Sequence, residues 1–151
     1  MFEIVTTDEP VSEPAAEGVP TVSGKIVIDD FQETFTASLA FWTRNEYELH
    51  WKRALERLIA GAERSALITD YVPPPARVSS EDYLVWWPLY RDGDTIYVQN
   101  HLLFFGQLSR PFSPDRPCNS VRDRQVVNED GQKISEWATT IGDIKQFLSQ
   151  H

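Results

Sequence analysis

The spacing of apolar residues along the chain predicts a succession of strands and two helices. Short runs in which apolar residues alternate with polar ones, or follow one another between turn residues, are typical of strands. Such runs occupy residues 24–30, 33–42, 65–72, 83–90, 95–105, 124–128 and 133–139. Phe2, Ile4 and Val5 have the composition for one more short strand at the start.

The two helices are predicted from apolar spacing and from capping residues. At about residues 43–60, Thr43 and Glu46 have the spacing of a capping box, which satisfies two free backbone N–H groups. Apolar residues then recur every three or four positions, and Gly61 is a stop signal. This stripe consists of Tyr47, Trp51, Leu55, Leu58 and Ile59. In the second helix, at about residues 140–149, Thr140 and Asp143 have cap spacing.

These elements predict an α+β fold with one domain. We expect a mostly antiparallel, twisted sheet that is packed by the first helix and closed by the C-terminal one. Residues 24–151 contain no interior linker long enough to divide them. Residues 1–23 are predicted to form an acidic, proline-containing N-terminal arm. Its part from 8 to 23 has little apolar surface to bury, so we expect that part to be mobile or loosely attached.

The most aromatic segment is a predicted hairpin, residues 83–105, with a tight turn at Asp92–Gly93. Alternation directs Trp87 and Leu89 toward the core. The opposite face then carries Leu84, Trp86, Pro88, Tyr90, Thr95, Tyr97, Gln99 and His101. A register shift of two residues leaves both faces unchanged, whereas a three-residue loop exchanges them. Either a helix or the N-terminal arm covers this second face, or it is a contact surface with aromatic anchors.

Charge distinguishes between classes of partner. The net charge is −9, and residues 1–24 contribute five acidic residues and no Lys or Arg. A chain of this sign repels a phosphate backbone, so we expect no direct nucleic-acid binding. It attracts a basic partner most strongly at low salt. The alternative is that the charge serves only to keep the protein in solution.

The residues that commonly carry chemistry form no recognisable motif. His50, His101 and His151 have no metal-ligand spacing, and no nucleophile elbow or phosphate-binding glycine loop occurs. We therefore expect no metal and no cofactor, although an active site dispersed along the chain stays open. Cys118 is the only cysteine, which favours a reducing compartment and predicts a cytoplasmic protein. The sequence begins without a secretory signal and has no apolar run that would span a membrane.

The order of several segments resembles a known family. GKIVIDDFQETFTASLAFW, YELHWKRALERL, SALIT, WWPLYRDGDTIYVQNHLLFF and VNEDGQKISEWATTIGDI together resemble the CdiI-type immunity proteins of bacterial contact-dependent growth inhibition systems. The likeness covers most of residues 24–144. It implies a cytoplasmic protein that is not an enzyme and that binds and neutralises the C-terminal toxin domain of a cognate CdiA-type effector. Many such toxins are nucleases with basic surfaces, so the resemblance implies a basic nuclease as the partner.

The resemblance and the charge together suggest where a toxin would bind. Carboxylates at the predicted turns can reach a partner without disturbing the core, and the second face of the hairpin offers aromatic anchors. The candidate partner-binding residues are Trp86, Tyr90, Asp92, Asp94, Tyr97, Glu129 and Asp130. One alternative is a small enzyme or ligand-binding domain that uses the aromatic face as a pocket. Another is a solubility or assembly module of a larger complex.

Overall fold

The strands fall into two antiparallel sheets, which confirms the α+β class but divides the predicted sheet. The computed structural model describes residues 1–8 and 18–151. The first sheet has the order β1-β2-β3, with β1 at Phe2–Thr7, β2 at Thr21–Ile28 and β3 at Phe31–Ser38. The short strand predicted at the start of the chain is confirmed. β2 begins three residues before its predicted start at Gly24, and residues 9–17 of the predicted arm lie outside the described part.

The second sheet has five strands and carries the aromatic hairpin. Its order is β4-β5-β6-β8, and β7 also pairs with β5. The bounds are Arg64–Asp70 for β4, Tyr83–Asp92 for β5, Thr95–Gln99 for β6, His101–Phe104 for β7 and Glu136–Thr140 for β8. β6 and β7 pair with β5 in the same register. Together they form the single strand predicted at 95–105, interrupted only at Asn100. Single 3-10 turns lie at Phe105–Gln107 (η1) and Pro117–Ser120 (η2).

The hairpin turn lies one residue further along the chain than predicted. Asp92 pairs with Thr95, so Gly93 and Asp94 form the two-residue turn. Gly93 has a φ of 61°, a conformation that glycine adopts without the steric cost of a Cβ. The pairing therefore differs from the predicted one by two residues, Leu89 facing Val98. Because side chains alternate with a period of two, both faces keep their predicted residues.

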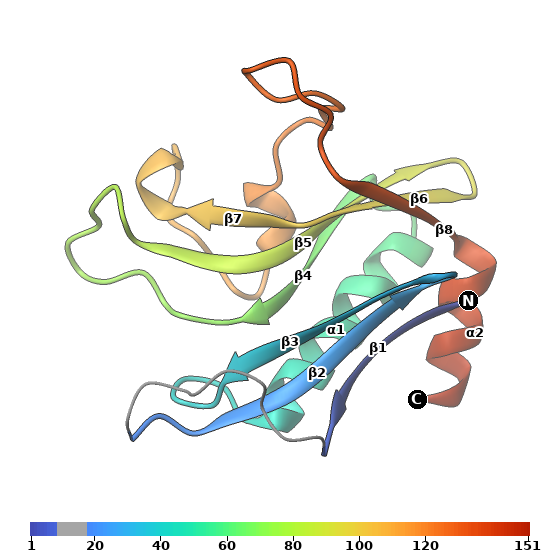
Figure 1. Ribbon diagram of the computed structural model, residues 1–151, viewed down its shortest axis with the longest axis horizontal. Helices are drawn as coiled ribbons and strands as arrows, with labels where there is room; N and C mark the ends of the chain where they lie inside the picture. The colour runs from blue at the N-terminus through green and yellow to red at the C-terminus, as the bar shows by residue number, and fades with distance from the viewer. Residues whose placement is uncertain (9–17) are drawn as a thin grey trace.

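Helix α1, Arg44–Ile59, has the predicted cap and packs against β4 and β1, on one side of the first sheet (Figure 1). The Thr43 side chain accepts from the Glu46 N–H at 3.2 Å, and the Glu46 carboxylate accepts from the Thr43 N–H at 3.1 Å. The predicted stripe is buried apart from its last member, Ile59, which is half-buried. Helix α2, Ile141–Gln150, begins as predicted, with the Thr140 hydroxyl accepting from the Asp143 N–H.

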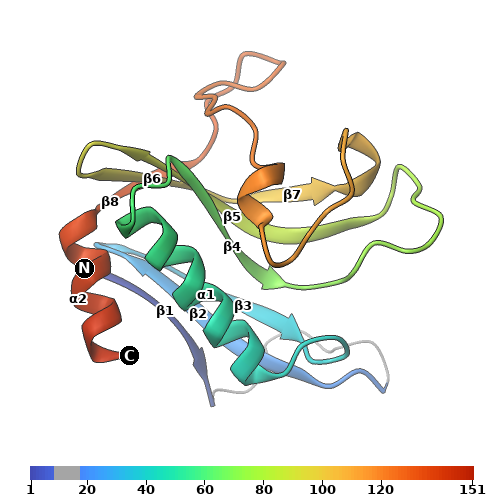
Figure 2. The same cartoon turned by 180° about the vertical axis from the view of Figure 1, so that it is seen from behind.

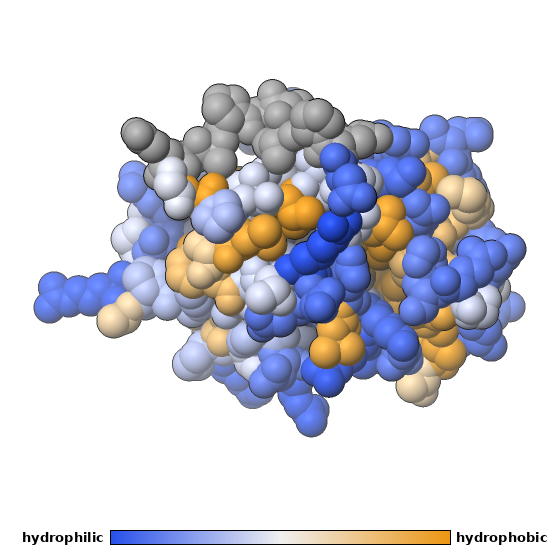
Figure 3. All heavy atoms as spheres, turned by 90° about the horizontal axis from the view of Figure 1, so that it is seen from below, coloured by the Kyte–Doolittle hydropathy of each residue, from blue (hydrophilic) through white to orange (hydrophobic). Residues whose placement is uncertain are grey.

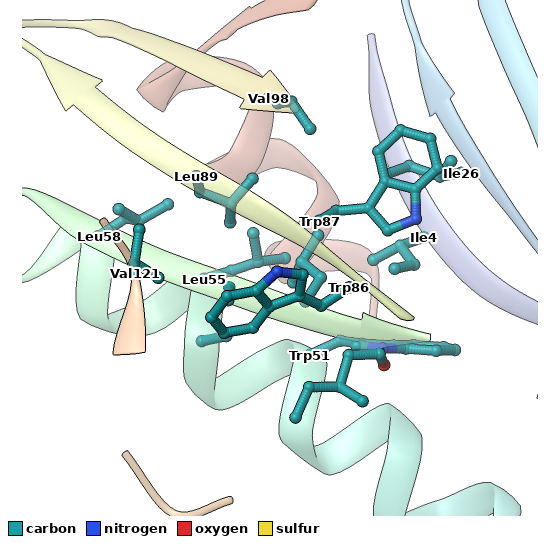
Figure 4. Close-up of a cluster of buried hydrophobic side chains, with 14 of the residues drawn as sticks. Ile4, Ile26, Trp51, Leu55, Leu58, Trp86, Trp87, Leu89, Val98 and Val121 are labelled. Carbon is teal, nitrogen blue, oxygen red and sulfur yellow. The ribbon is translucent and has the colours of Figure 1, made fainter. Parts of the chain in front are cut away.

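Aromatic side chains join the two sheets. Trp87 of β5 points toward Ile4 and Ile26 of the first sheet (Figure 4). The ring of Phe31 stacks on Trp137 of β8 with centroids 4.1 Å apart, and both rings lie within 6.3 Å of the ring of Trp87. Burial of such large rings contributes a major share of the stability of a small domain. The sheets and α1 therefore share one hydrophobic core.

Side chains of α1 also cover the free edge of β4. The Ile68 N–H donates to His50 Nε2 at 2.8 Å, and the indole N–H of Trp51 donates to the Ile68 carbonyl at 2.7 Å. The Ser65 hydroxyl donates to the Ala54 carbonyl of the helix at 2.9 Å. In the sequence His50 lies in the middle of the predicted helix, among charged residues. In the structure it is buried, where it fills the place of a missing strand partner.

Candidate functional site

The β5–β6 turn presents two of the candidate carboxylates to solvent. Asp92 and Asp94 are both exposed. The Asp94 carbonyl accepts from the Ile141 N–H at 2.9 Å, which fixes the turn against the start of α2. The neighbouring cation, Arg91, donates to the carbonyls of Leu58 and Gly93 and forms no ion pair with either carboxylate. The turn is therefore a fixed acidic protrusion.

The second acidic turn lies in a loop that the sequence predicted to be a regular hairpin. Only one β-bridge forms there, between Val127 and Lys133. The Asn128 side chain holds the turn by accepting from the N–H groups of Asp130, at 3.0 Å, and Gln132, at 2.9 Å. Glu129 and Asp130 are exposed, as expected for a turn.

Two apolar residues beside this turn were missed by the sequence analysis. Val126 and Val127 are 52% and 50% exposed. A regular strand buries every second side chain, so the apparent strand 124–128 predicted that one of the two valines would be covered. The loop instead extends away from the sheet, and both valines reach solvent next to the two carboxylates. The signal available in the sequence was the polar composition on both sides of the pair, RDRQ at 122–125 and NEDGQK at 128–133.

Tyr97 lies on the outer face of the five-stranded sheet, half-buried. The guanidinium of Arg124 lies 3.7 Å from the centre of its ring, a cation–π contact. Arg124 also pairs with Glu136, its Nε donating at 2.8 Å. That hydrogen bond is the main reason why the pKa of Glu136 is lowered and the pKa of Arg124 is raised. Tyr97 is therefore partly accessible to solvent, beside the Arg124–Glu136 ion pair.

Trp86 and Tyr90 are buried, so their prediction as exposed anchors is corrected. Trp86 is 3% and Tyr90 is 8% exposed. The segment from 105 to 125 crosses this face of the sheet (Figure 2), and the ring of Phe112 lies 6.4 Å from that of Trp86. We expected a helix or the N-terminal arm to cover this face, whereas the cover at Trp86 is the irregular segment that contains Phe112. This apolar contact removes the free-energy cost of exposing the Trp86 ring to water.

A small cavity remains between this segment and the sheet. Its volume is about 200 Å³, and Trp86, Tyr90, Gln99 and His101 contribute to its wall. The polar groups there bind one another: His101 Nε2 and Gln99 Oε1 are 2.7 Å apart, and Gln99 Nε2 donates to Glu136 at 2.7 Å. Burial lowers the pKa of His101. The side chains of His101 and Gln99 are therefore already paired, with each other and with Glu136.

The candidate residues do not form one compact site. In Figure 1 the β5–β6 turn lies at the end of the molecule near α2, whereas the loop with Glu129 and Asp130 projects beyond the five-stranded sheet. Tyr97 and the Arg124–Glu136 pair lie on the sheet between them. Figure 3 shows the side of the molecule away from that loop, where hydrophobic residues reach the surface in separate patches among hydrophilic ones. The candidate surface is therefore extended, with acidic ends.

Among residues 1–8 and 18–151, no group of three or more His, Cys, Asp or Glu side chains could hold a metal ion. No helix within the same ranges is long and apolar enough to cross a membrane.

Comparison with known proteins gives consistent matches. Residues 37–147 match the model of the CdiI N-terminal domain family. The chain is 30% identical to the immunity protein CdiI of Enterobacter cloacae subsp. cloacae, over 97% of this chain and 96% of that protein. It also superposes on a chain of the CdiA-CT/CdiI toxin and immunity complex from Enterobacter cloacae with a TM-score of 0.83 and 29% identity, covering 99% and 97% of the two chains. The family match and this nearly full-length similarity show that the chain belongs to the CdiI family of immunity proteins.

Proposed function

We propose that this protein binds the C-terminal toxin domain of a cognate CdiA-type effector in the cytoplasm and neutralises it as a one-to-one complex. The observation that carries the proposal is the similarity, along almost the whole chain, to a protein whose solved structure is a toxin and immunity complex. Immunity proteins of this family act by binding and not by catalysis. The self-paired polar groups of the small cavity described above are compatible with such a role.

We propose further that the toxin is a nuclease with a basic surface. The net charge of −9 supports this, because a nuclease needs cationic side chains to bind a phosphate backbone. An acidic inhibitor is attracted to the same cations, which raises its association rate.

The proposed contact surface runs from the β5–β6 turn across Tyr97 to the 126–130 loop. Asp92 and Asp94 form one acidic end, and Glu129 and Asp130 form the other. Val126 and Val127 add an exposed apolar patch at the second end, which a partner could bury. In this proposal Trp86 and Tyr90 stiffen the sheet beneath the surface and make no direct contact.

The experiment measures toxin-binding kinetics at two salt concentrations. One variant carries Asp92→Asn and Asp94→Asn, and another carries Glu129→Gln and Asp130→Asn. If these carboxylates face the toxin, each variant should associate more slowly than the wild type. The salt dependence of association should also be weaker, because charges at the rim of an interface act mainly on the on-rate.

A matched control separates local contact from overall charge. Glu56 and Glu81 are exposed and make no side-chain hydrogen bond or ion pair to the described residues. The double change Glu56→Gln and Glu81→Gln alters net charge by the same amount as each test variant. Equal slowing in control and test variants would place the interface elsewhere, and the absence of any complex would overturn the proposed function.

A further inference from the structure

A second cavity, larger than the first, lies beside α1. Its volume is about 640 Å³, and it is bounded by the helix on one side and by residues 114–118 on the other. That volume is in the range of sites that hold small ligands. Trp42 closes one end, where its ring stacks on Tyr71 with centroids 4.2 Å apart. The walls are therefore held by packed aromatic rings and by a regular helix.

The cavity is cationic although the protein is strongly acidic. Arg53, Arg57 and Arg116 line it, against two acidic residues, Glu46 and Asp115. The Glu46 carboxylate is already used, because it accepts from the Thr43 N–H in the helix cap. The guanidinium groups of Arg53 and Arg116 make no hydrogen bond or ion pair to any residue that the structure describes. Two guanidinium groups are therefore available to a ligand.

His50 adds a buried donor to the same wall. Its side chain is 8% exposed, and its Nε2 accepts the Ile68 N–H, so the ring proton resides on Nδ1. Nδ1 makes no hydrogen bond within residues 1–8 and 18–151. Burial, helped by the charge of Arg57, lowers the pKa of His50 to about 3. The imidazole is therefore a neutral N–H donor at neutral pH.

Arg57 shows the same incomplete pairing. Its Nη2 donates to the Asp115 carbonyl at 2.6 Å, which ties the 114–118 segment to α1. Its Nη1 is buried and has no partner among the described residues. A buried donor without a partner is costly, so a cavity that contains one gains free energy when an acceptor enters. An acceptor with negative charge benefits most, because hydrogen bonds to ionised groups are the stronger ones.

We infer that this cavity binds an oxyanion, a carboxylate or phosphate group, which accepts hydrogen bonds from His50 and Arg57 and is attracted by Arg53 and Arg116. Trp42 provides an apolar wall for the rest of the ligand. The group belongs either to a free small molecule or to an acidic side chain of a bound toxin. The inference does not depend on the proposed function, because it is tested first on the protein alone.

The test titrates the full-length protein with inorganic phosphate and with citrate at constant ionic strength. Binding is followed by the NMR resonances of the His50 imidazole and the Trp42 indole, with chloride as the reference salt. We expect saturable shifts at both groups. Arg53→Gln and Arg116→Gln should each weaken the binding of citrate by about tenfold, because each removes one guanidinium charge that attracts the anion.

Lys52→Gln is the matched control. Lys52 follows Trp51 on α1 and lines a different groove, beside β1 and α2, so the same charge change there should leave the affinity unchanged. The side chains of Arg53 and Arg116 make no hydrogen bond or ion pair to the described residues, so both variants should stay folded. An unchanged thermal unfolding temperature would verify this. The inference is overturned if no saturable binding occurs, or if Lys52→Gln weakens it as much as the arginine changes do.

Adding saturating toxin domain then identifies the source of the oxyanion. If the toxin supplies a carboxylate, it displaces citrate, and Arg53→Gln and Arg116→Gln accelerate dissociation of the toxin. If the ligand is a free small molecule, the complex binds citrate as well as the free protein does. Either result assigns the ligand, and failure of the toxin to bind at all would leave the measurement on the free protein intact.

Discussion

Acidification should destabilise the folded protein through one residue, His50. Its pKa is about 3 in the folded state, against 6.5 for an unperturbed histidine. Between these two values the unfolded chain binds a proton that the folded chain excludes. The stability is therefore complete above about pH 6.5 and falls as the pH drops toward 3, by about 1.4 kcal/mol per pH unit. From pH 7 to pH 5 the loss from this residue amounts to about 2 kcal/mol.

The measurement compares the wild type with His50→Gln by urea unfolding at pH 7 and pH 5. Glutamine places an oxygen near the position of Nε2, so it keeps an acceptor for the Ile68 N–H but does not titrate. Other titrating groups, such as His101 and Glu136, act equally in both proteins. We expect the variant to lose about 2 kcal/mol less than the wild type on acidification. Equal losses in the two proteins would refute the idea that His50 is buried and neutral.

Two further predictions concern packing. Trp51→Ala should lower the free energy of unfolding by about 3–5 kcal/mol, as a large-to-small core change. Trp51→Phe should lower it by about 1–3 kcal/mol, because phenylalanine keeps a ring but leaves the Ile68 carbonyl unpaired. Chemical denaturation of both variants would test this, and a loss below about 1 kcal/mol for alanine would contradict the burial. Gly24→Ala should cost about 1–3 kcal/mol, because an added Cβ would lie 2.3 Å from the ring of Phe35. Thermal unfolding should show the loss, and Phe35→Leu should relieve it; if it does not, the crowding is not at that ring.

The features that the sequence predicted well are those with local causes. The start of α1 follows from the Thr43 side chain and the residue three positions later, and the start of α2 follows from Thr140 in the same way. The two faces of the hairpin depend only on alternation, so they survived an error of two residues in its register. The exact pairing depends on which residue of the turn adopts a positive φ, and both Asp92–Gly93 and Gly93–Asp94 satisfy the same local pattern.

The features that the sequence did not predict depend on contacts between distant segments. Trp86 and Tyr90 seemed free because their cover, around Phe112, lies in an irregular segment without periodicity. The role of His50 depends on Ile68, a strand residue that needs a partner only because β4 lies at an edge. The division into two sheets likewise depends on which strands pair across the chain. The cavity lined by Arg53, Arg57 and Arg116 was missed because Arg116 comes from a loop whose position is set by tertiary packing.

The coverage of β4 by α1 has a consequence for association between molecules. A strand at the edge of a sheet is a template for a strand of another molecule, and it can seed aggregation. On β4 the N–H and carbonyl groups of Ile68 are occupied by side chains of the helix, so an incoming strand finds no free groups at that position. Packing of α1 on β4 therefore protects this position of the edge from pairing with a strand of another molecule.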